Sequence, residues 1–227
     1  MKNDFLEKHR QFAFRVKLLI LGYFDGSLHF LVEEPKVLGF LRLPNCIMNI
    51  DDTFDSVVKR LIHERFRQKD LHWEHVRVDA KVEKTEQGAI ISVGIFAAID
   101  YKTYLKESKC NSNACWKKLN DTDKMKADDA ALVFQSFQQL KERARFLPLG
   151  FYLLGNSFTY YQLQKLFEHV LDEIYDRPNF RRKMKATGLI EPIEEMQNQV
   201  QHRPAQHFRF NQEKYELIKK RGFEFRF

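Results

Sequence analysis

The spacing of apolar residues along the chain predicts its elements, and the shortest predicted helix has the most distinctive pattern. Phe180, Met184 and Thr187 recur at i, i+4 and i+7, which predicts one narrow buried stripe. Asp176 and Gly188 bound this segment, because an aspartate suits a helix N-cap and a glycine suits the left-handed residue after a helix. The sequence therefore predicts a helix between these two residues that packs through one face only.

The other face of this predicted helix is basic, with no acidic residue after the cap. It carries Arg177, Arg181, Arg182, Lys183 and Lys185. A short helix with one packed face and one basic face is how a DNA recognition helix is built. A solvated basic helix end has the same composition, and this segment alone leaves both interpretations open.

The segments on either side of the basic helix favour the first interpretation. Upstream, Thr159 and Gln162 have the spacing of a capping box, and apolar residues at helical spacing follow them. Downstream, Leu189–Ile193 predicts a strand, and 202–210 ends in the alternation of a second strand. A helix, a polar turn, a basic helix and a hairpin together predict a winged helix-turn-helix.

The first 147 residues mix strand and helix patterns, which predicts an α+β domain. Strands are expected at Gln11–Gly22, Leu28–Val32, Trp73–Val82 and Ala89–Ile99, the last with Gly94 as a bulge or a point of ligand approach. Helices are expected from Phe54 to Phe66, capped by Asp51 or Asp52, and over Ala127–Phe146 with an apolar face of Ala130, Ala131, Val133, Phe134, Phe137 and Leu140. The segment Cys110–Lys126 is polar and typical of a loop. Because Pro148 and Gly150 interrupt the second helix, we place the domain boundary between 1–147 and 148–227.

Composition excludes some classes of protein. The 227 residues carry a formal net charge of +7, which is compatible with nucleic-acid binding but is spread over both predicted domains. No apolar run reaches the roughly 18 residues that a membrane helix needs, so no membrane association is expected. The three cysteines cannot all pair, and reduced thiols in a cytoplasmic protein are the simplest interpretation. Cysteine and histidine spacing matches no common zinc pattern, and no cofactor is expected.

Residues 38–67 resemble a Nudix box in which several positions have changed. With Cys46 at the opening glycine, Asp52 falls at the first glutamate, Arg60 at the arginine and Glu64 at the first residue of the Glu-Glu pair. Leu61, Arg65 and Arg67 replace a glutamate, a metal-binding glutamate and the closing glycine. Hydrolysis of the Nudix type needs clustered carboxylates to hold Mg²⁺, so we expect no enzyme activity. An Arg60–Glu64 ion pair on the helix surface is the alternative role for these two residues.

A decayed Nudix box followed by a winged helix is similar to the Nudix-related transcriptional regulators of the NrtR type. The matching motifs are Pro148-Leu-Gly-Phe151, Phe158-Thr-x-x-Gln-Leu-Gln164, Asn179-Phe-Arg-Arg182, and Arg203-Pro-Ala205 leading to Phe208-x-Phe210. The resemblance implies a Nudix-like α/β/α sandwich with a mixed sheet, followed by the winged helix-turn-helix. It also implies a non-catalytic domain that binds a small effector, which is ADP-ribose in regulators of NAD metabolism and a sugar in an arabinose-regulator branch. The decayed box favours the sugar branch.

From this resemblance we expect a homodimeric regulator that binds a palindromic operator in double-stranded DNA. The expected DNA contacts are Thr159, Tyr161, Arg177, Asn179, Arg181, Arg182, Lys185, Arg203 and His207. The expected effector contacts are Phe40, Arg42, Asn45, Glu64 and Phe96, where the polar groups bind and the two aromatic rings form a wall. For each ring taken singly, the pattern favours an ordinary place in the core. The alternatives in function are a Nudix hydrolase acting on a nucleoside diphosphate such as ADP-ribose, and a winged helix that only contacts proteins.

Overall fold

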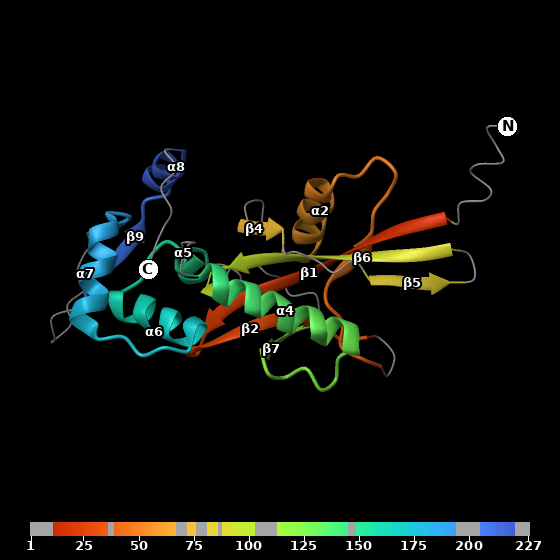
Figure 1. Ribbon diagram of the computed structural model, residues 1–227, viewed down its shortest axis with the longest axis horizontal. Coiled ribbons are helices and arrows are strands. Elements are labelled where there is room, and N and C mark those ends of the chain that lie inside the picture. Colours follow the sequence, from red (N-terminus) through yellow and green to blue (C-terminus); the bar gives the residue numbers. More distant parts are fainter. Residues whose placement is uncertain are drawn as a thin grey trace. The chain divides into compact units, whose positions relative to one another are not determined.

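The computed structural model describes residues 11–35, 39–66, 72–75, 81–85, 88–102, 113–144, 149–193 and 205–220. The strands are β1 (Gln11–Phe24), β2 (Ser27–Glu33), β3 (Asn45–Ile47), β4 (His72–His75), β5 (Lys81–Thr85), β6 (Gly88–Ile99), β7 (Ala114–Lys118), β8 (Ile190–Pro192) and β9 (Phe208–Phe210). The helices are α2 (Phe54–Phe66), α4 (Ala127–Arg143), α5 (Leu149–Leu154), α6 (Tyr160–Leu171), α7 (Arg177–Thr187) and α8 (Gln212–Lys220), shown in Figure 1. No helix in these ranges is both long and apolar enough to cross a membrane.

The described residues group into two compact units. The first, the sheet unit, takes its described residues from 11–21, 30–97 and 113–136, and the second, the winged-helix unit, takes them from 22–29, 98–102 and 137–220. The turn between β1 and β2 thus belongs with the winged helix although it lies far from it in sequence. The predicted boundary after residue 147 cuts the chain once, whereas this grouping interleaves three segments, so the boundary stays a prediction.

The sheet has seven strands in the order β4-β6-β1-β2-β7, with β3 paired to β1 and β5 paired to β6. Asp25 and Gly26 join β1 to β2 with positive φ angles of 49° and 71°, the backbone of a tight hairpin turn whose twist suits the flanking strands. The run Leu18–Leu21 is fully buried, which confirms a strand covered on both faces. The single strand predicted over Trp73–Val82 is instead two strands, β4 and β5, and residues 76–80 lie outside the described ranges.

Helices α2 and α4 cover opposite faces of this sheet. Val16 on β1 is paired with Cys46 on β3, so their side chains share a face, and Arg60 of α2 donates to the Cys46 sulfur. The next β1 residue, Lys17, points to the other face, where its ammonium lies 2.5 Å from an Asp129 carboxylate oxygen of α4. Figure 1 shows the two helices on either side of the sheet. The expected α/β/α sandwich is therefore present.

Three local predictions for the first domain are corrected. The cap of α2 is Thr53, whose hydroxyl accepts from the Ser56 amide at 3.1 Å while the Ser56 hydroxyl accepts from the Thr53 amide at 3.0 Å. Gly94 serves helix packing, because a Cβ there would lie 2.5 Å from the Leu132 side chain of α4. The segment predicted as a loop contains β7, whose Ala-Cys-Trp-Lys-Lys sequence has no strict alternation to reveal it.

Helix α4 is present as expected, but it turns a different face to the protein. Leu132, Val133, Ser136 and Leu140 are buried, whereas the Phe134 side chain is 64% exposed. Residues 145–148, which the prediction placed in this helix and its end, lie outside the described ranges. The sequence placed Phe134 on the apolar face by composition, and packing against Gly94 selects the neighbouring stripe instead.

The winged-helix unit follows its prediction closely. Thr159 and Gln162 form the capping box of α6, Asp176 accepts from the Asn179 amide to cap α7, and Gly188 ends α7 with a φ of 62°. Strands β8 and β9 pair antiparallel, with Pro192 opposite Phe208. Each of these features depends on residues close in sequence, except the β8–β9 pairing, which the alternation of 202–210 had indicated.

Candidate functional site

Helix α7 separates a buried face from a basic face. Phe180 and Met184 are 2% and 0% exposed, so the side of the helix that carries them faces the protein. At 100° per residue, Arg182 and Lys185 lie on the opposite side, and both are exposed. Arg177 and Arg181 lie on one flank, between these two sides. The helix thus presents two exposed cations outward, two more along one edge, and Lys183 along the other edge.

The flanking arginines lie against the first turn of α6. The Arg181 guanidinium carbon is 5.1 Å from the centre of the Tyr160 ring. The Arg177 guanidinium carbon and the Lys165 ammonium are 5.6 Å and 5.9 Å from the Tyr161 ring. These distances fall within the roughly 6 Å over which a ring attracts a cation. Tyr161 and Arg177 are therefore brought together as expected, whereas Tyr160 is a residue that the sequence did not single out.

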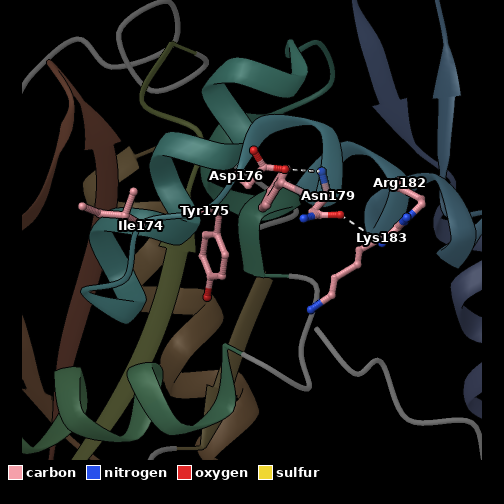
Figure 2. A pocket seen from close by; sticks show the side chains of 7 residues that line it. Ile174, Tyr175, Asp176, Asn179, Arg182 and Lys183 are labelled. Atoms are coloured by element: carbon pink, nitrogen blue, oxygen red, sulfur yellow. Dashed lines mark hydrogen bonds between the residues drawn. The ribbon is translucent and has the colours of Figure 1, made fainter.

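The start of α7 has a second polar arrangement. The side-chain oxygen Oδ1 of Asn179 accepts a hydrogen bond of 2.9 Å from Arg182. This bond holds the two expected DNA contacts together, as Figure 2 shows. A pocket of about 350 Å³ opens beside them and is lined by Ile174, Tyr175, Asp176, Asn179, Phe180, Arg182 and Lys183. Because Asn179 and Arg182 line this pocket, it forms part of the same surface as their hydrogen bond.

The remaining expected DNA contacts occupy three different settings. The Thr159 hydroxyl accepts a hydrogen bond from the Gln162 backbone N–H in the capping box, so it stabilises the start of α6. His207 lies just before β9, with its Nδ1 atom 2.8 Å from the Ser157 hydroxyl. Lys185 is exposed in the last turn of α7. Arg203 lies outside the described residues.

A partly buried network that the sequence did not reveal fixes the turn between α6 and α7. One Glu168 carboxylate oxygen accepts from the Gln164 amide at 2.8 Å and from the Tyr175 backbone N–H at 3.1 Å. Gln164 also donates to the Tyr175 carbonyl oxygen at 2.8 Å. Hydrogen bonds from Lys165 and Gln164 keep the pKa of Glu168 below its usual value. Gln164, the second glutamine of the motif Gln162-Leu-Gln164, indicates this network only once the fold is known.

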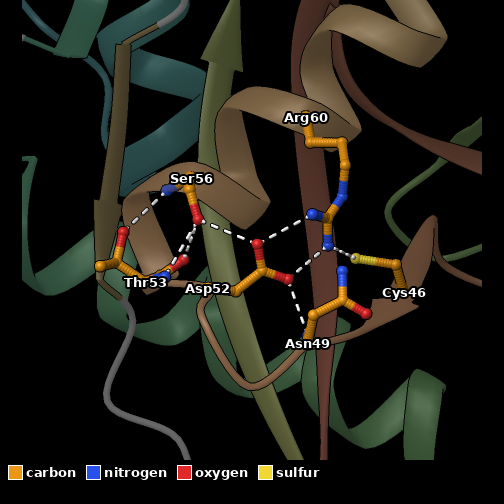
Figure 3. A network of polar contacts seen from close by, with 6 residues as sticks. All are labelled: Cys46, Asn49, Asp52, Thr53, Ser56 and Arg60. Carbon is orange, nitrogen blue, oxygen red and sulfur yellow. Dashed lines mark hydrogen bonds and ion pairs between the residues drawn. The ribbon is translucent and has the colours of Figure 1, made fainter.

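In the sheet unit, the decayed box forms a compact polar cluster, shown in Figure 3. The Asp52 carboxylate accepts from both terminal nitrogens of Arg60, at 2.9 Å and 2.8 Å. It also accepts from the backbone N–H of Asn49 at 2.7 Å. Arg60 also donates to the Cys46 sulfur at 3.9 Å. Arg60 therefore pairs with Asp52, eight residues earlier, and its expected pairing with Glu64 is not the one observed.

This cluster does not suit a magnesium ion. Mg²⁺ requires several free oxygen ligands in octahedral geometry. Both oxygens of Asp52 are already bound to the Arg60 guanidinium, and Leu61 is fully buried where the Nudix pattern has a glutamate. Across the described part of the chain, no three His, Cys, Asp or Glu side chains gather as a metal site.

The Asp52–Arg60 pair leads to a prediction about acid stability. Hydrogen bonds from Arg60 and then Asn49 lower the pKa of Asp52 from 3.8 to about 2. The pair thus stabilises the fold fully above pH 4, and this contribution is lost as the pH falls towards 2. In Asp52→Asn the contribution is absent at every pH, so we expect a lower thermal midpoint at pH 7 and a smaller difference from wild type at pH 2. Melting curves from pH 2 to 7 measure this, and an equal deficit at both ends contradicts it.

The expected effector contacts are not gathered into one site. Asn45 pairs with Lys17 and so lies on the α4 face of the sheet, where its amide donates to the Leu43 carbonyl oxygen at 2.8 Å. Phe96, two residues after Gly94, lies on the same face and is only 4% exposed, so it is a core residue. Glu64 is exposed on α2, which covers the opposite face.

Two further residues of that set lie on the segment before β3. Phe40 is 54% exposed, and Arg42 is exposed. The segment itself is held in place, since the backbones of Glu33 and Arg42 exchange hydrogen bonds of 2.8 Å and 3.1 Å. These two side chains are available to a ligand, but the set as a whole spans both faces of the sheet.

Comparison with known proteins agrees with both parts of the fold. Residues 150–210 match the family model described as the NrtR DNA-binding winged helix domain. The chain is 27% identical over 217 residues to the ADPR responsive transcriptional repressor NtrR of Acinetobacter baylyi. This similarity covers 92% of this chain and 86% of that protein.

Solved structures show the same fold over most of the chain. Shewanella oneidensis NrtR complexed with a 27mer DNA matches with a TM-score of 0.77 and 20% identity, covering 93% of this chain and 97% of that one. A MutT/nudix family protein from Enterococcus faecalis matches with a TM-score of 0.65 and 16% identity, covering 93% and 94%. The chain therefore has the fold of these structures, in which a Nudix-like domain precedes a winged helix domain.

Proposed function

We propose that this chain is a transcriptional repressor that binds operator DNA through α7 and releases it in response to ADP-ribose. The proposal of DNA binding rests on the polarity of α7, which has Phe180 and Met184 buried on one side and exposed cations on the other. The family match over residues 150–210 supports the same role. A winged helix used only for protein contacts has no need of this basic face.

From their positions on α7, we assign different tasks to the basic residues. Arg182, held to Asn179, and Lys185 lie on the outward side of α7, so they enter the major groove, where an asparagine or arginine reads base edges. Arg177 and Arg181 lie on the flank, where contacts to phosphates fix the position of the helix on the duplex. His207, beside β9, is placed for the backbone contacts of a wing.

We propose a homodimer, because a single helix of 11 residues reads only a few base pairs. The Phe134 side chain, 64% exposed on α4, is a candidate for the dimer interface. Light scattering with and without a palindromic site measures this directly. A monomer that occupies such a site as one protein per duplex contradicts the dimer.

ADP-ribose is the effector we propose, because the Acinetobacter baylyi relative, similar along 92% of this chain, is ADPR responsive. The sugar expected from the decayed box finds no support in the comparisons. The dispersed positions of Asn45, Glu64 and Phe96 weaken the particular sugar site that the sequence suggested. The binding of both Asp52 oxygens to Arg60 argues against hydrolysis of ADP-ribose but not against its binding.

The test is a titration of protein against a duplex selected from random DNA by the protein itself, with and without ligand. We expect ADP-ribose to weaken DNA binding, and DNA to weaken ADP-ribose binding by the same factor. In the absence of DNA, ADP-ribose at 100 times its dissociation constant stabilises the protein by about 2.7 kcal/mol. If a pentose or hexose produces both effects and ADP-ribose produces neither, the effector assignment is wrong. Release of nucleotide products with Mg²⁺, at about 1 per second or faster, identifies an enzyme instead.

A further inference from the structure

We propose that Tyr160 is a positioning residue that holds Arg181 in place for a DNA phosphate, and that the wing strand β9 in turn fixes Tyr160. This inference rests on the proposed DNA-binding function and adds to it a residue from outside the recognition helix. It rests on two contacts of the same ring. One contact is made with the arginine, and the other is made with Phe208.

The first contact orients the arginine. Its guanidinium carbon is 5.1 Å from the centre of the Tyr160 ring, close enough for the ring face to attract the cation. Arg181 is exposed, and an exposed arginine samples many rotamers when nothing restrains it. Restraint before binding matters because side chains that become ordered only in the complex weaken the affinity.

The second contact orients the tyrosine. The Tyr160 and Phe208 rings meet edge to face, with their centres 4.4 Å apart and their planes 61° apart. Phe208 is only 8% exposed, and its backbone exchanges two hydrogen bonds with Phe158, of 3.0 Å and 2.8 Å. Because β9 and the residues before α6 are bonded to each other, Phe208 is a rigid support for Tyr160.

The next residue provides an internal comparison. Tyr161 also lies near cations, Arg177 and Lys165, but its side chain is 55% exposed. A half-buried ring that packs edge-on against a buried phenylalanine is held more firmly than a ring that is mostly in solvent. We therefore assign the positioning role to Tyr160 and expect a weaker effect from Tyr161.

The consequence for binding follows from the position of Arg181 on the flank of α7. A flanking arginine contacts phosphates, which are the same in every sequence. Loss of its restraint should therefore weaken binding to the selected site and to random DNA by similar factors. This distinguishes Tyr160 from Arg182, whose loss should act on one base pair.

The experiment compares Tyr160→Leu, Tyr160→Phe and Arg181→Ala in fluorescence anisotropy at fixed salt, with the full-length protein. Tyr160→Leu keeps an apolar side chain against Phe208 but removes the ring, and we expect affinity to fall about 2–10-fold. Tyr160→Phe keeps the ring, and we expect it to restore most of that loss. In the Arg181→Ala background, Tyr160→Leu should cause no further loss, because its partner is already absent.

A merely structural role predicts a different result. If Tyr160→Leu causes the same loss with and without Arg181, the positioning role is overturned. Should Tyr160→Leu lower the melting temperature strongly, Phe208→Leu tests the support of Tyr160 while leaving the tyrosine in place. Phe208→Leu should then weaken DNA binding, and in the Arg181→Ala background it should cause no further loss of affinity. An Arg181→Ala protein that binds DNA normally, with an unchanged salt slope, also overturns the proposal. Wild-type protein that binds no DNA overturns the proposed function itself.

Discussion

Replacing Asp129 with alanine is expected to destabilise the sheet unit by about 3–5 kcal/mol, a large part of the 5–15 kcal/mol typical of a folded domain. The Lys17 and Asp129 side chains are only 12% and 7% exposed. Without the carboxylate, the Lys17 ammonium stays buried with no counter-charge at 2.5 Å, and the Leu43 backbone N–H loses an acceptor at 3.4 Å. Urea unfolding at pH 7 measures the change.

Two controls separate burial from charge. The pair between Lys59 and Asp55 on α2 is also short, at 2.7 Å, but its side chains are 65% and 51% exposed. Asp55→Ala should therefore cost at most about 1 kcal/mol. Replacing both buried partners, with Lys17→Met and Asp129→Leu together, should recover most of the loss, since no uncompensated charge remains. Equal costs for the buried and exposed pairs contradict the explanation.

Phe180→Ala is expected to destabilise the winged-helix unit by about 3–5 kcal/mol and to abolish operator binding with it. Phe180 is 2% exposed, and its ring centre lies 5.9 Å from that of Phe167 on α6 and 5.8 Å from that of Tyr175. A helix of 11 residues is marginal by itself, so α7 depends on Phe180 and Met184 for its place. Thermal unfolding followed by circular dichroism measures the loss.

The matched control on the same helix is Lys185→Ala. Lys185 is exposed, so its removal should change stability by no more than about 0.5 kcal/mol. As a major-groove contact, its loss should weaken binding by about 1–3 kcal/mol at one base pair. An unfolded Lys185→Ala protein, or a fully stable Phe180→Ala protein, means that the two faces of α7 have been assigned the wrong way round.

In the sheet unit, two residues that match the Nudix pattern bind each other. Asp52 and Arg60 keep the positions that the Nudix pattern gives them, but they bind each other. An arginine that occupies both oxygens of a carboxylate removes the negative charge that a metal ion needs.

Some features of this protein follow from the sequence by itself. The caps Thr159, Asp176 and Gly188 and the basic face of α7 were all evident in residues a few positions apart. Caps, turns and helical stripes are satisfied by neighbours in sequence, so the pattern of residue types determines them. The winged helix was therefore predictable down to its individual caps.

The tertiary structure alone decided which distant side chains meet. The sequence predicted Asp51 or Asp52 as the N-cap of α2. In the structure Thr53 is the cap, and Asp52 instead binds Arg60. The fold also turned Phe134 to solvent, placed Asn45 and Glu64 on different sides of the sheet, and set Tyr160 between Arg181 and Phe208. These outcomes depend on strand register and on which helix stripe packs against the sheet. Register and packing are fixed by the whole core at once, so no local pattern records them.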